Sequence, residues 1–257
     1  MGLKAESAAA GRELPLQRVR NVRDLGGYAW HDDNGDGGAT AFGRFLRGPS
    51  LRRANARDRA YLASYGEGLA RVIDLRSDFE VKHWPDPYVD GSLGVDYVRV
   101  PMLDQLNSGG FRDALPDRMF TVYRRLLDKD AESIAQVMQA LDAPGTVLFH
   151  CRVGKDRTGV IAALLLSLAG VSDADVVTDY AATQQYMGRF LGVQRVAVSV
   201  GLCKRAPRSL FEAVPEEMAL TMEHMRRTYG MARDYLTAYA GCDEALVNRL
   251  CERLRGE

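Results

Sequence analysis

Short runs of apolar and β-branched residues alternate along this chain with longer stretches in which apolar residues recur every three or four positions. Runs of about four to eight such residues, bounded by Gly or Pro, are typical of buried strands. The run at residues 21–27 also contains paired glycines, which permit a tight turn. We expect strands within residues 21–27, 43–50, 71–75, 97–100 and 146–149.

The longer stretches predict helices. Residues 56–65 have helical spacing, and the apolar positions between 111 and 141 predict either a helical pair or one bent helix, interrupted near 128–130. Another helix is expected to begin near Arg157 and to end at Leu168. The remaining helices, each opened or closed by Asp, Pro or Gly, are expected at residues 173–187, 215–228, 231–240 and 243–254.

Strands that alternate with helices favour a parallel sheet covered on both faces. The sequence therefore predicts an α/β fold with a central, mostly parallel sheet of about four to five strands flanked by helices, and with a helical C-terminal part. No linker or shift in composition divides the chain, so we interpret residues 1–257 as a single domain. The first residues of the chain, about 1–18, are a candidate disordered segment.

The charge of the chain excludes a globally basic or acidic protein. The 34 Lys and Arg residues balance the 34 Asp and Glu residues, so no overall field attracts nucleic acid or an anionic membrane. We therefore expect no nucleic-acid partner. A preference for an anionic substrate has to come from a local group of residues.

Cysteine usage and the apolar runs indicate the compartment. The cysteines at 151, 203, 242 and 251 have neither zinc-ligand spacing nor the density of a disulfide scaffold, which fits a reducing environment. The polar N-terminal segment lacks the features of a secretory signal. The longest apolar run, residues 160–171, is too short to cross a bilayer and is better interpreted as a buried helix. We expect a cytoplasmic protein without stable membrane insertion.

The segment HCRVGKDRTG, His150 to Gly159, carries the chemistry that the sequence suggests. A cysteine six residues before a basic residue is weak evidence alone, because chance gives roughly 0.5 such pairs in a chain of this composition. Here the cysteine stands where a strand ends, Gly154 lies in the loop, and a helix begins at the arginine. Successive backbone N–H groups can then surround one anion beside the positive end of a helix.

Individual residues of this segment have readable roles. Cys151 is the candidate nucleophile, because N–H dipoles, a helix N-terminus and a guanidinium all stabilise a thiolate. Arg157 presents a planar fork that can hold two phosphate oxygens and strengthens its grip in the transition state. His150 is expected to hold the loop geometry, and Thr158 to donate its hydroxyl to the thiolate. The candidate phosphate-binding residues are Arg152, Val153, Gly154, Lys155, Asp156 and Arg157.

This segment resembles the phosphate-binding loop of the protein tyrosine and dual-specificity phosphatase superfamily. More narrowly, it is similar to the bacterial branch with H-C-x-x-G-K-D-R-T-G, which includes PtpB-like enzymes and phosphoinositide phosphatases. NVRDLGG at 21–27, DLRS at 74–77 and TYG at 228–230 support the narrower match. The resemblance implies a phosphocysteine mechanism without metal or cofactor. In it the thiolate attacks phosphorus, an acid protonates the leaving oxygen, and water hydrolyses the enzyme intermediate.

The resemblance also implies a general acid on a separate loop and a lid. Asp104, in VPMLDQL, matches the position of the acid and is the first choice for acid and later base. Asp156 is the rival, because it too lies beside the phosphate. Residues 183–211 could form a lid, as helices there do in PtpB-like enzymes, or an ordinary helical hairpin. A structural salt bridge is expected between Asp74 and Arg76.

Three functions stay open at this point. The leading hypothesis is a phosphatase acting on phosphotyrosine, and also on phosphoserine, phosphothreonine or phosphoinositides, with Arg152 and Lys155 receiving extra negative charge. The second is a phosphatase of a small metabolite such as a sugar or nucleoside phosphate. The third is a phosphate-binding pseudophosphatase. The expected partner is accordingly a phosphorylated protein, a phosphoinositide or a small phosphometabolite, and the oligomeric state is left open.

Overall fold

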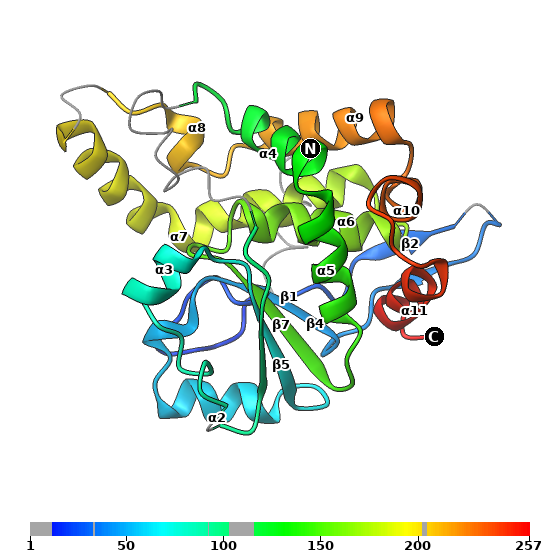
Figure 1. Ribbon diagram of the computed structural model, residues 1–257, viewed down its shortest axis with the longest axis horizontal. Helices are drawn as coiled ribbons and strands as arrows, with labels where there is room; N and C mark the ends of the chain where they lie inside the picture. Colours follow the sequence, from blue (N-terminus) through cyan, green and yellow to red (C-terminus); the bar gives the residue numbers. More distant parts are fainter. Residues whose placement is uncertain (1–11, 33, 92, 103–115, 202–204) are drawn as a thin grey trace.

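The computed structural model of the chain describes residues 12–257 except 33, 92, 103–115 and 202–204. A five-stranded sheet lies at its centre (Figure 1), with β1 antiparallel to its neighbour and the other strands parallel. This confirms the predicted fold class. In spatial order the strands are β1 (Arg23–Asp24), β4 (Phe45–Gly48), β7 (Thr146–His150), β5 (Leu69–Asp74) and β6 (Asp96–Arg99).

The strands divide their side chains between two cores. Successive residues of a strand point to opposite faces of the sheet. Accordingly, Phe45 of β4 lies in the larger core and Leu46 in the smaller one, and Phe149 and Leu148 of β7 divide in the same way. Because both faces are buried, the central strands read as continuous apolar runs instead of alternating ones.

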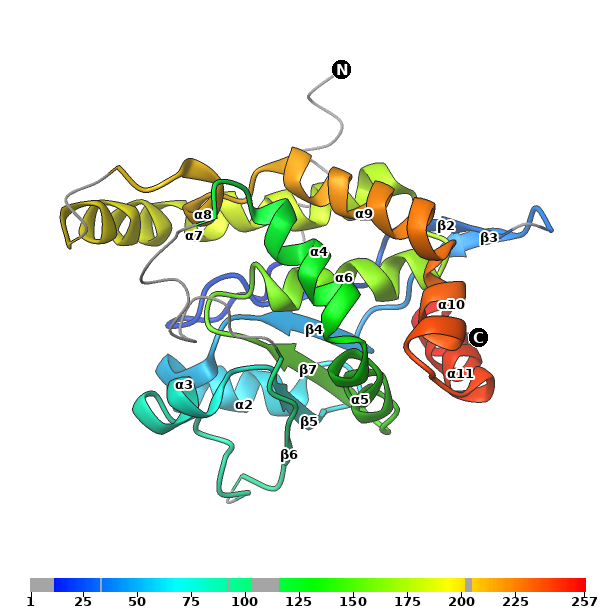
Figure 2. The same cartoon turned by 45° about the horizontal axis from the view of Figure 1, so that its top comes forward.

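Helices from residue 119 onward cover the face of the larger core (Figure 2). The one against the sheet, α6 (Arg157–Leu168), is buried almost all round, because further helices lie over it. The other helices on this face are α4 (Met119–Lys129), α5 (Ala131–Leu141), α7 (Asp173–Gly201), α9 (Pro215–Tyr229) and α11 (Glu244–Arg255).

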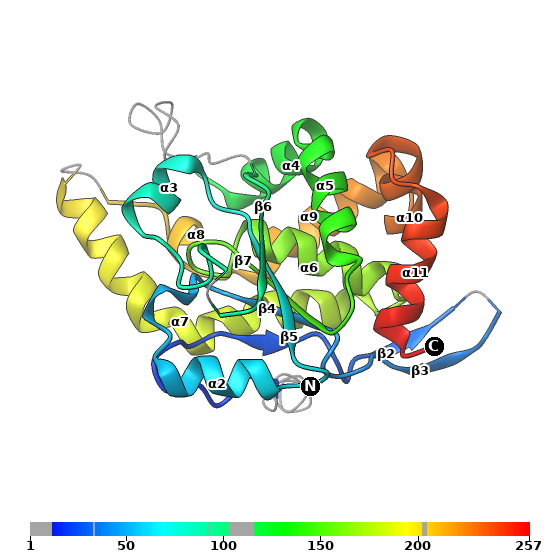
Figure 3. The same ribbon diagram turned by 60° about the horizontal axis from the view of Figure 1, so that its bottom comes forward.

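The opposite face of the sheet is covered by fewer helices (Figure 3). It is covered by α2 (Ala56–Ser64) and by an N-terminal segment in which Leu14 and Leu16 are buried. Residues 12–18 are thus part of the fold, whereas residues 1–11 lie outside the described residues. The short helix α3 (Asp78–His83) follows β5, and a 3-10 turn, η1 (Leu51–Arg53), follows β4.

The remaining elements lie at the periphery. Strands β2 (Ala29–His31) and β3 (Gly37–Ala39) form a separate hairpin near the C-terminal helices. Between α7 and α9 lies α8 (Arg208–Phe211), and between α9 and α11 come α10 (Ala232–Asp234) and the π-helical turn η3 (Tyr235–Tyr239).

Most predicted elements are present, with two informative differences. The helix predicted to end at 187 continues to Gly201. It does so although Gly188 and Gly192 each destabilise it by about 1 kcal/mol relative to alanine. The helix α3 was not predicted, because its six residues are too few to display a periodic pattern. The run 160–171 largely forms α6, and no helix among the described residues has both the length and the apolar character to span a bilayer.

The parallel strands fix where a site can form. The loops after β4, β5, β6 and β7 all leave from the carboxyl edge of the sheet. Ligand sites of open α/β sheets form at this edge. The segment His150–Gly159 begins there, between the ends of β4 and β5.

Candidate active site

The candidate phosphate-binding loop, residues 151–157, connects β7 to α6. Cys151 follows the strand directly and is only 2% exposed. Gly154 has a φ of +76°, and a Cβ atom there would lie 2.6 Å from the backbone of Gly48. Only glycine fits both the left-handed backbone and this close approach. The loop therefore lies directly against the end of β4.

The backbone of the loop is polarised. Among the described residues, the N–H groups of 152–156 donate to no protein acceptor. Successive N–H groups of this kind beside a helix N-terminus suit an anion. The carbonyls, in contrast, accept bonds from outside the loop: Arg152 O from Ser50 N at 3.3 Å, Val153 O from Asn21 Nδ2 at 3.1 Å, and Gly154 O from Arg47 Nη2 at 2.8 Å.

The guanidinium of Arg157 is held by a carboxylate that the sequence analysis missed. Glu80 is 1% exposed and accepts two bonds from it, Nη1 to Oε2 at 2.7 Å and Nη2 to Oε1 at 3.0 Å. Nη1 also donates to the carbonyl of Leu75 at 3.2 Å. A bidentate arrangement fixes the plane of an arginine as well as its position. The orientation of Arg157 is therefore set before any ligand binds.

A capping box places Glu80. Ser77 is the N-cap of α3, and its Oγ accepts from the N–H of Glu80, whose carboxylate in turn accepts from the N–H of Ser77. The pattern S-x-x-E at 77–80 is a helix-start signal that could have revealed both α3 and this buried acid. It overlaps the DLRS motif at 74–77, which drew attention to Asp74 and Arg76 instead.

A buried charge cluster supports the loop from behind. The carboxylate of Asp179, on α7, pairs with Arg47 and with Arg23, the latter at 3.4 Å between Oδ1 and Nε. All three side chains are at most 2% exposed. Since Arg47 also donates to the carbonyl of Gly154, and Arg23 to the side chain of Asn21, the cluster reaches the loop through both arginines.

The two arginines decide the protonation state of Asp179. Burial by itself raises the pKa of this carboxyl group, but the charges of Arg47 and Arg23 outweigh it, and the pKa is lowered. The hydroxyl of Tyr28, which donates to Oδ1 at 3.1 Å, adds to the effect. Asp179 is thus held as a carboxylate, and losing any member of the cluster would leave an uncompensated buried charge.

Lys155 turns its ammonium toward the helical part of the chain. Its side chain is 1% exposed, and Nζ lies 2.9 Å from the carbonyl of Leu210 and 3.3 Å from those of Ser209 and Glu212. These carbonyls belong to α8 and the residues just beyond it. Lys155 therefore fastens the 209–212 segment to the loop.

Asp156 is the last residue of the loop before α6 and occupies the N-cap position of that helix. Its Oδ1 accepts from the hydroxyl of Tyr123 at 2.6 Å, and that hydroxyl lies 2.7 Å from the hydroxyl of Tyr180. Burial, and next the charge of Asp156, raise the pKa of both tyrosines well above the usual value. Both phenols consequently stay protonated, and the carboxylate is fixed by a neutral donor and by Lys155, whose Nζ lies 3.2 Å away.

A second buried network lies behind His150. Its Nε2 is 3.5 Å from Asp86 and its Nδ1 is 3.9 Å from Asp74. The expected salt bridge is present, because Arg76 donates to Asp74 at 2.6 Å and lies 3.9 Å from Asp86. Burial would raise the pKa of Asp74, yet His150, Arg76 and the hydroxyl of Tyr97 together lower it well below its usual range.

Three side chains of this network are close enough together to resemble a metal site. Asp74, Asp86 and His150 offer ligand atoms within 4.8 Å of one another. However, the guanidinium of Arg76 binds one of these carboxylates and adjoins the other, so it already supplies the cation that they face. The arrangement fits an ion-pair network that stiffens the end of β7.

Other predicted residues are placed as follows. The hydroxyl of Thr158 is buried and has no hydrogen-bond partner among the described residues, and the Arg152 guanidinium is exposed, 4.5 Å above the ring of Trp84. Cys242 and Cys251 are buried away from the loop, Cys251 in α11 and Cys242 in the connection that precedes it. Asp104 and Cys203 lie outside the described residues.

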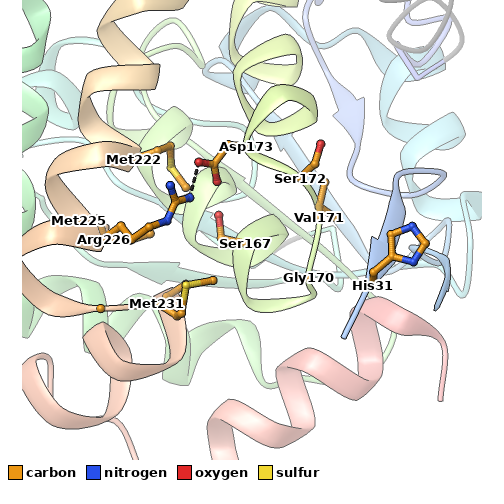
Figure 4. A pocket seen from close by; sticks show the side chains of 12 residues that line it. His31, Ser167, Gly170, Val171, Ser172, Asp173, Met222, Met225, Arg226 and Met231 are labelled. Atoms are coloured by element: carbon orange, nitrogen blue, oxygen red, sulfur yellow. Dashed lines mark hydrogen bonds and ion pairs between the residues drawn. The ribbon is translucent and has the colours of Figure 1, made fainter. Parts of the chain in front are cut away.

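A cavity of about 290 Å³ lies at the far end of α6 (Figure 4). From Arg157 to Ser167 the helix rises about 15 Å, so this cavity is separate from Cys151. Met222 and Met225 of α9, and Met231 just beyond it, contribute to its wall. Its labelled lining residues are His31, Ser167, Gly170, Val171, Ser172, Asp173, Met222, Met225, Arg226 and Met231.

Glu80→Gln tests the role of the buried acid. The amide keeps the shape but removes the charge and one acceptor, so Arg157 loses its fixed orientation. We expect kcat/KM for an aryl phosphate to fall by about ten- to a hundredfold, as expected for a lost charged hydrogen bond. The control is Asp78→Asn on the same helix, where the carboxylate is 88% exposed and pairs with Arg99. Equal kinetics for both variants would contradict the assignment.

The comparisons with known proteins agree on one family. The model of the tyrosine phosphatase family matches residues 14–256. A tyrosine-protein phosphatase of Nostoc commune is 37% identical over 56% of this chain, which spans about half (49%) of that protein. A putative tyrosine-protein phosphatase of Cupriavidus necator is 30% identical over 90% of this chain and 85% of its own length.

Two further proteins are similar. The triple specificity protein phosphatase PtpB of Mycobacterium tuberculosis is 27% identical over 89% of this chain and 97% of its own. The solved core catalytic domain of a PP-IP phosphatase from Saccharomyces cerevisiae aligns with a TM-score of 0.29 and 17% identity, over 62% of this chain and 90% of that one. Because the family model covers nearly every residue, this chain belongs to the tyrosine phosphatase family.

Proposed function

We propose that this protein hydrolyses phosphate monoesters through a phosphocysteine at Cys151. The observation that carries the proposal is the polarity of the loop: its carbonyls are bonded outward, while the N–H groups of 152–156 meet no acceptor among the described residues. Such a loop, beside the N-terminus of α6, attracts a phosphate and favours a thiolate.

The chemistry then has two steps. In the first, the thiolate attacks phosphorus, an S–P bond forms, the P–O bond to the leaving group breaks, and an acid protonates the departing oxygen. In the second, a base takes a proton from water, whose oxygen attacks phosphorus and releases inorganic phosphate and the thiolate. Arg157, oriented by Glu80, binds the equatorial oxygens, on which charge spreads in both transition states.

The two basic residues of the loop have different parts in this proposal. The ammonium of Lys155 is engaged by three carbonyls of the 209–212 segment, so its part is to hold the loop. Arg152 is exposed on the loop, over Trp84, and is the cation that meets additional negative groups of a substrate. Thr158 supports the thiolate with a buried hydroxyl that has no other acceptor in the described part of the chain.

Two aspartates are candidates for acid and base. Asp156 is held at the loop by Tyr123, 2.6 Å away, and keeps an exposed fraction of 21%, so it can reach a bound phosphate ester. Asp104 is proposed from the family pattern alone. The same residue acts as acid in the first step and as base in the second.

Phosphotyrosine is the proposed main substrate, with phosphoserine, phosphothreonine and phosphoinositides as further candidates. The similarity to a triple specificity phosphatase supports a broad range, and the exposed Arg152 suits substrates with more than one negative group. We propose that residues 1–257 act as a single domain. A metabolite phosphatase and a pseudophosphatase remain the alternatives, and no observation among the described residues favours either.

Cys151→Ser separates hydrolysis from binding. A serine hydroxyl is not ionised at neutral pH, so we expect turnover of an aryl phosphate to fall below detection. Inorganic phosphate should still bind, as measured by calorimetry, because the loop is unchanged. The matched control, Cys242→Ser, should keep its activity. A pseudophosphatase would instead bind phosphate in the wild-type form, under reducing conditions, without hydrolysing an activated aryl ester.

Asp104→Asn and Asp156→Asn identify the acid. An alkyl phosphate needs protonation of its leaving oxygen, whereas an activated aryl phosphate does not. The variant that removes the acid should lose about a hundredfold or more in kcat on the alkyl ester and far less on the aryl ester. A residue whose replacement slows both esters equally is not the acid.

The substrate class is decided by a screen of kcat/KM on phosphopeptides, phosphoinositides, and sugar or nucleoside phosphates. The proposal predicts the highest value on a phosphotyrosyl peptide. A clearly higher value on a sugar or nucleoside phosphate would favour the metabolite phosphatase instead.

A further inference from the structure

The distal half of α7 extends beyond the body of the protein (Figures 1 and 2). In its first three turns the helix buries residues such as Asp179 and Tyr180 against the core, but after Thr183 only Leu191 is buried among the described positions. A helix that leaves the core usually ends there, because tertiary packing supplies most of its stability. Packing against the core therefore does not explain why the helix continues to Gly201.

An apolar row runs along this extension. Phe190, Val193, Val196 and Val200 are 42%, 71%, 64% and 72% exposed. Their spacing of three or four residues places them on one side of the helix. Val196 and Val200 also border a cavity of about 360 Å³ between α7 and residues 205–212, to which Phe211 adds a third apolar side chain.

The segment of the chain that carries the row has no acidic residue of its own. No Asp or Glu occurs between Asp179 and Glu212, although the chain as a whole is neutral. Arg189 is exposed and, by helical geometry, lies on the same side as Val193 and Val196. Arg205 is exposed just beyond the helix. The balanced net charge thus conceals a local basic and apolar segment.

The extension is connected to the loop of the site. Arg195 donates to the carbonyl of Ala206 at 3.0 Å and lies 3.5 Å from the carboxylate of Glu212. The carbonyl of Glu212 is in turn one of the three that hold Lys155. A surface that binds the extension would therefore be fixed in position relative to the phosphate-binding loop.

We propose that residues 189–200 form a docking surface for an anionic phospholipid bilayer. A helix with an apolar row and basic flanks lies in the plane of a membrane interface, with its apolar side chains among the headgroups and the upper acyl chains. Anionic lipids attract the arginines. The binding is peripheral, in keeping with the lack of a helix among the described residues that could cross a bilayer.

A lipid surface fits this row better than a protein partner does. Stable protein complexes bury roughly 800 Å² on each side, which four partly exposed side chains do not supply. A segment without any carboxylate also favours a partner of uniformly negative charge.

Vesicle sedimentation with the full chain tests the proposal and needs no turnover. We expect the wild-type protein to bind vesicles that contain phosphatidylserine about tenfold more tightly than vesicles of phosphatidylcholine alone, with binding weakened by salt. The triple variant Val193→Ser, Val196→Ser, Val200→Ser should bind at least about tenfold more weakly. Arg189→Gln should weaken binding about fivefold.

The controls distinguish docking from misfolding and from the hydrolytic activity. Val89→Ser changes a 46% exposed valine elsewhere and should bind vesicles like the wild type. The triple variant should hydrolyse a soluble aryl phosphate at the wild-type rate. Equal binding of wild type and triple variant to anionic vesicles would overturn the proposal. A wild-type dimer in solution that the triple variant abolishes would overturn it as well, because the row would then be an interface between two copies.

Discussion

The buried carboxylate of Asp179, held between Arg23 and Arg47, is the interaction on which the rest of the site depends. Burying three charges is costly, and the arrangement is stable only while every member is paired, since removal of one partner typically costs about 3–5 kcal/mol. The cluster joins α7 to β1 and β4, and through Arg47 it reaches the carbonyl of Gly154. A helix from the second half of the chain thereby fixes the backbone of the loop.

In the proposed mechanism, the distribution of its backbone groups is what gives the loop its affinity for a phosphate. Arg47, Asn21 and Ser50 bind successive carbonyls from outside, so the N–H groups are left to the inner side. Glu80 performs a matching task for Arg157, because its two hydrogen bonds fix the orientation of the guanidinium. In the proposed mechanism, the ion pairs stand behind the phosphate and the N–H dipoles face it, which is how a preorganised electrostatic site works.

The sequence predicted the parts of this site that are local. The apolar run 146–149, the loop glycine and the helix start at Arg157 follow one another within a few residues, so periodicity and spacing were enough to find them. Asp179 and Glu80 were not found, because their partners are 156 and 77 positions away, and a carboxylate on a helix is usually solvated. The length of α7 was also missed, since its last turns contain glycines and do not face the core.

The proposed mechanism requires Cys151 to form a bond to phosphorus. The most direct measurement is to quench the enzyme with acid during turnover of an aryl phosphate, digest it, and locate covalent phosphate by mass spectrometry. We expect phosphate on the peptide that contains Cys151, and none on that peptide in Cys151→Ser. Turnover with no covalent phosphate on any peptide, or with phosphate on a different side chain, would contradict it.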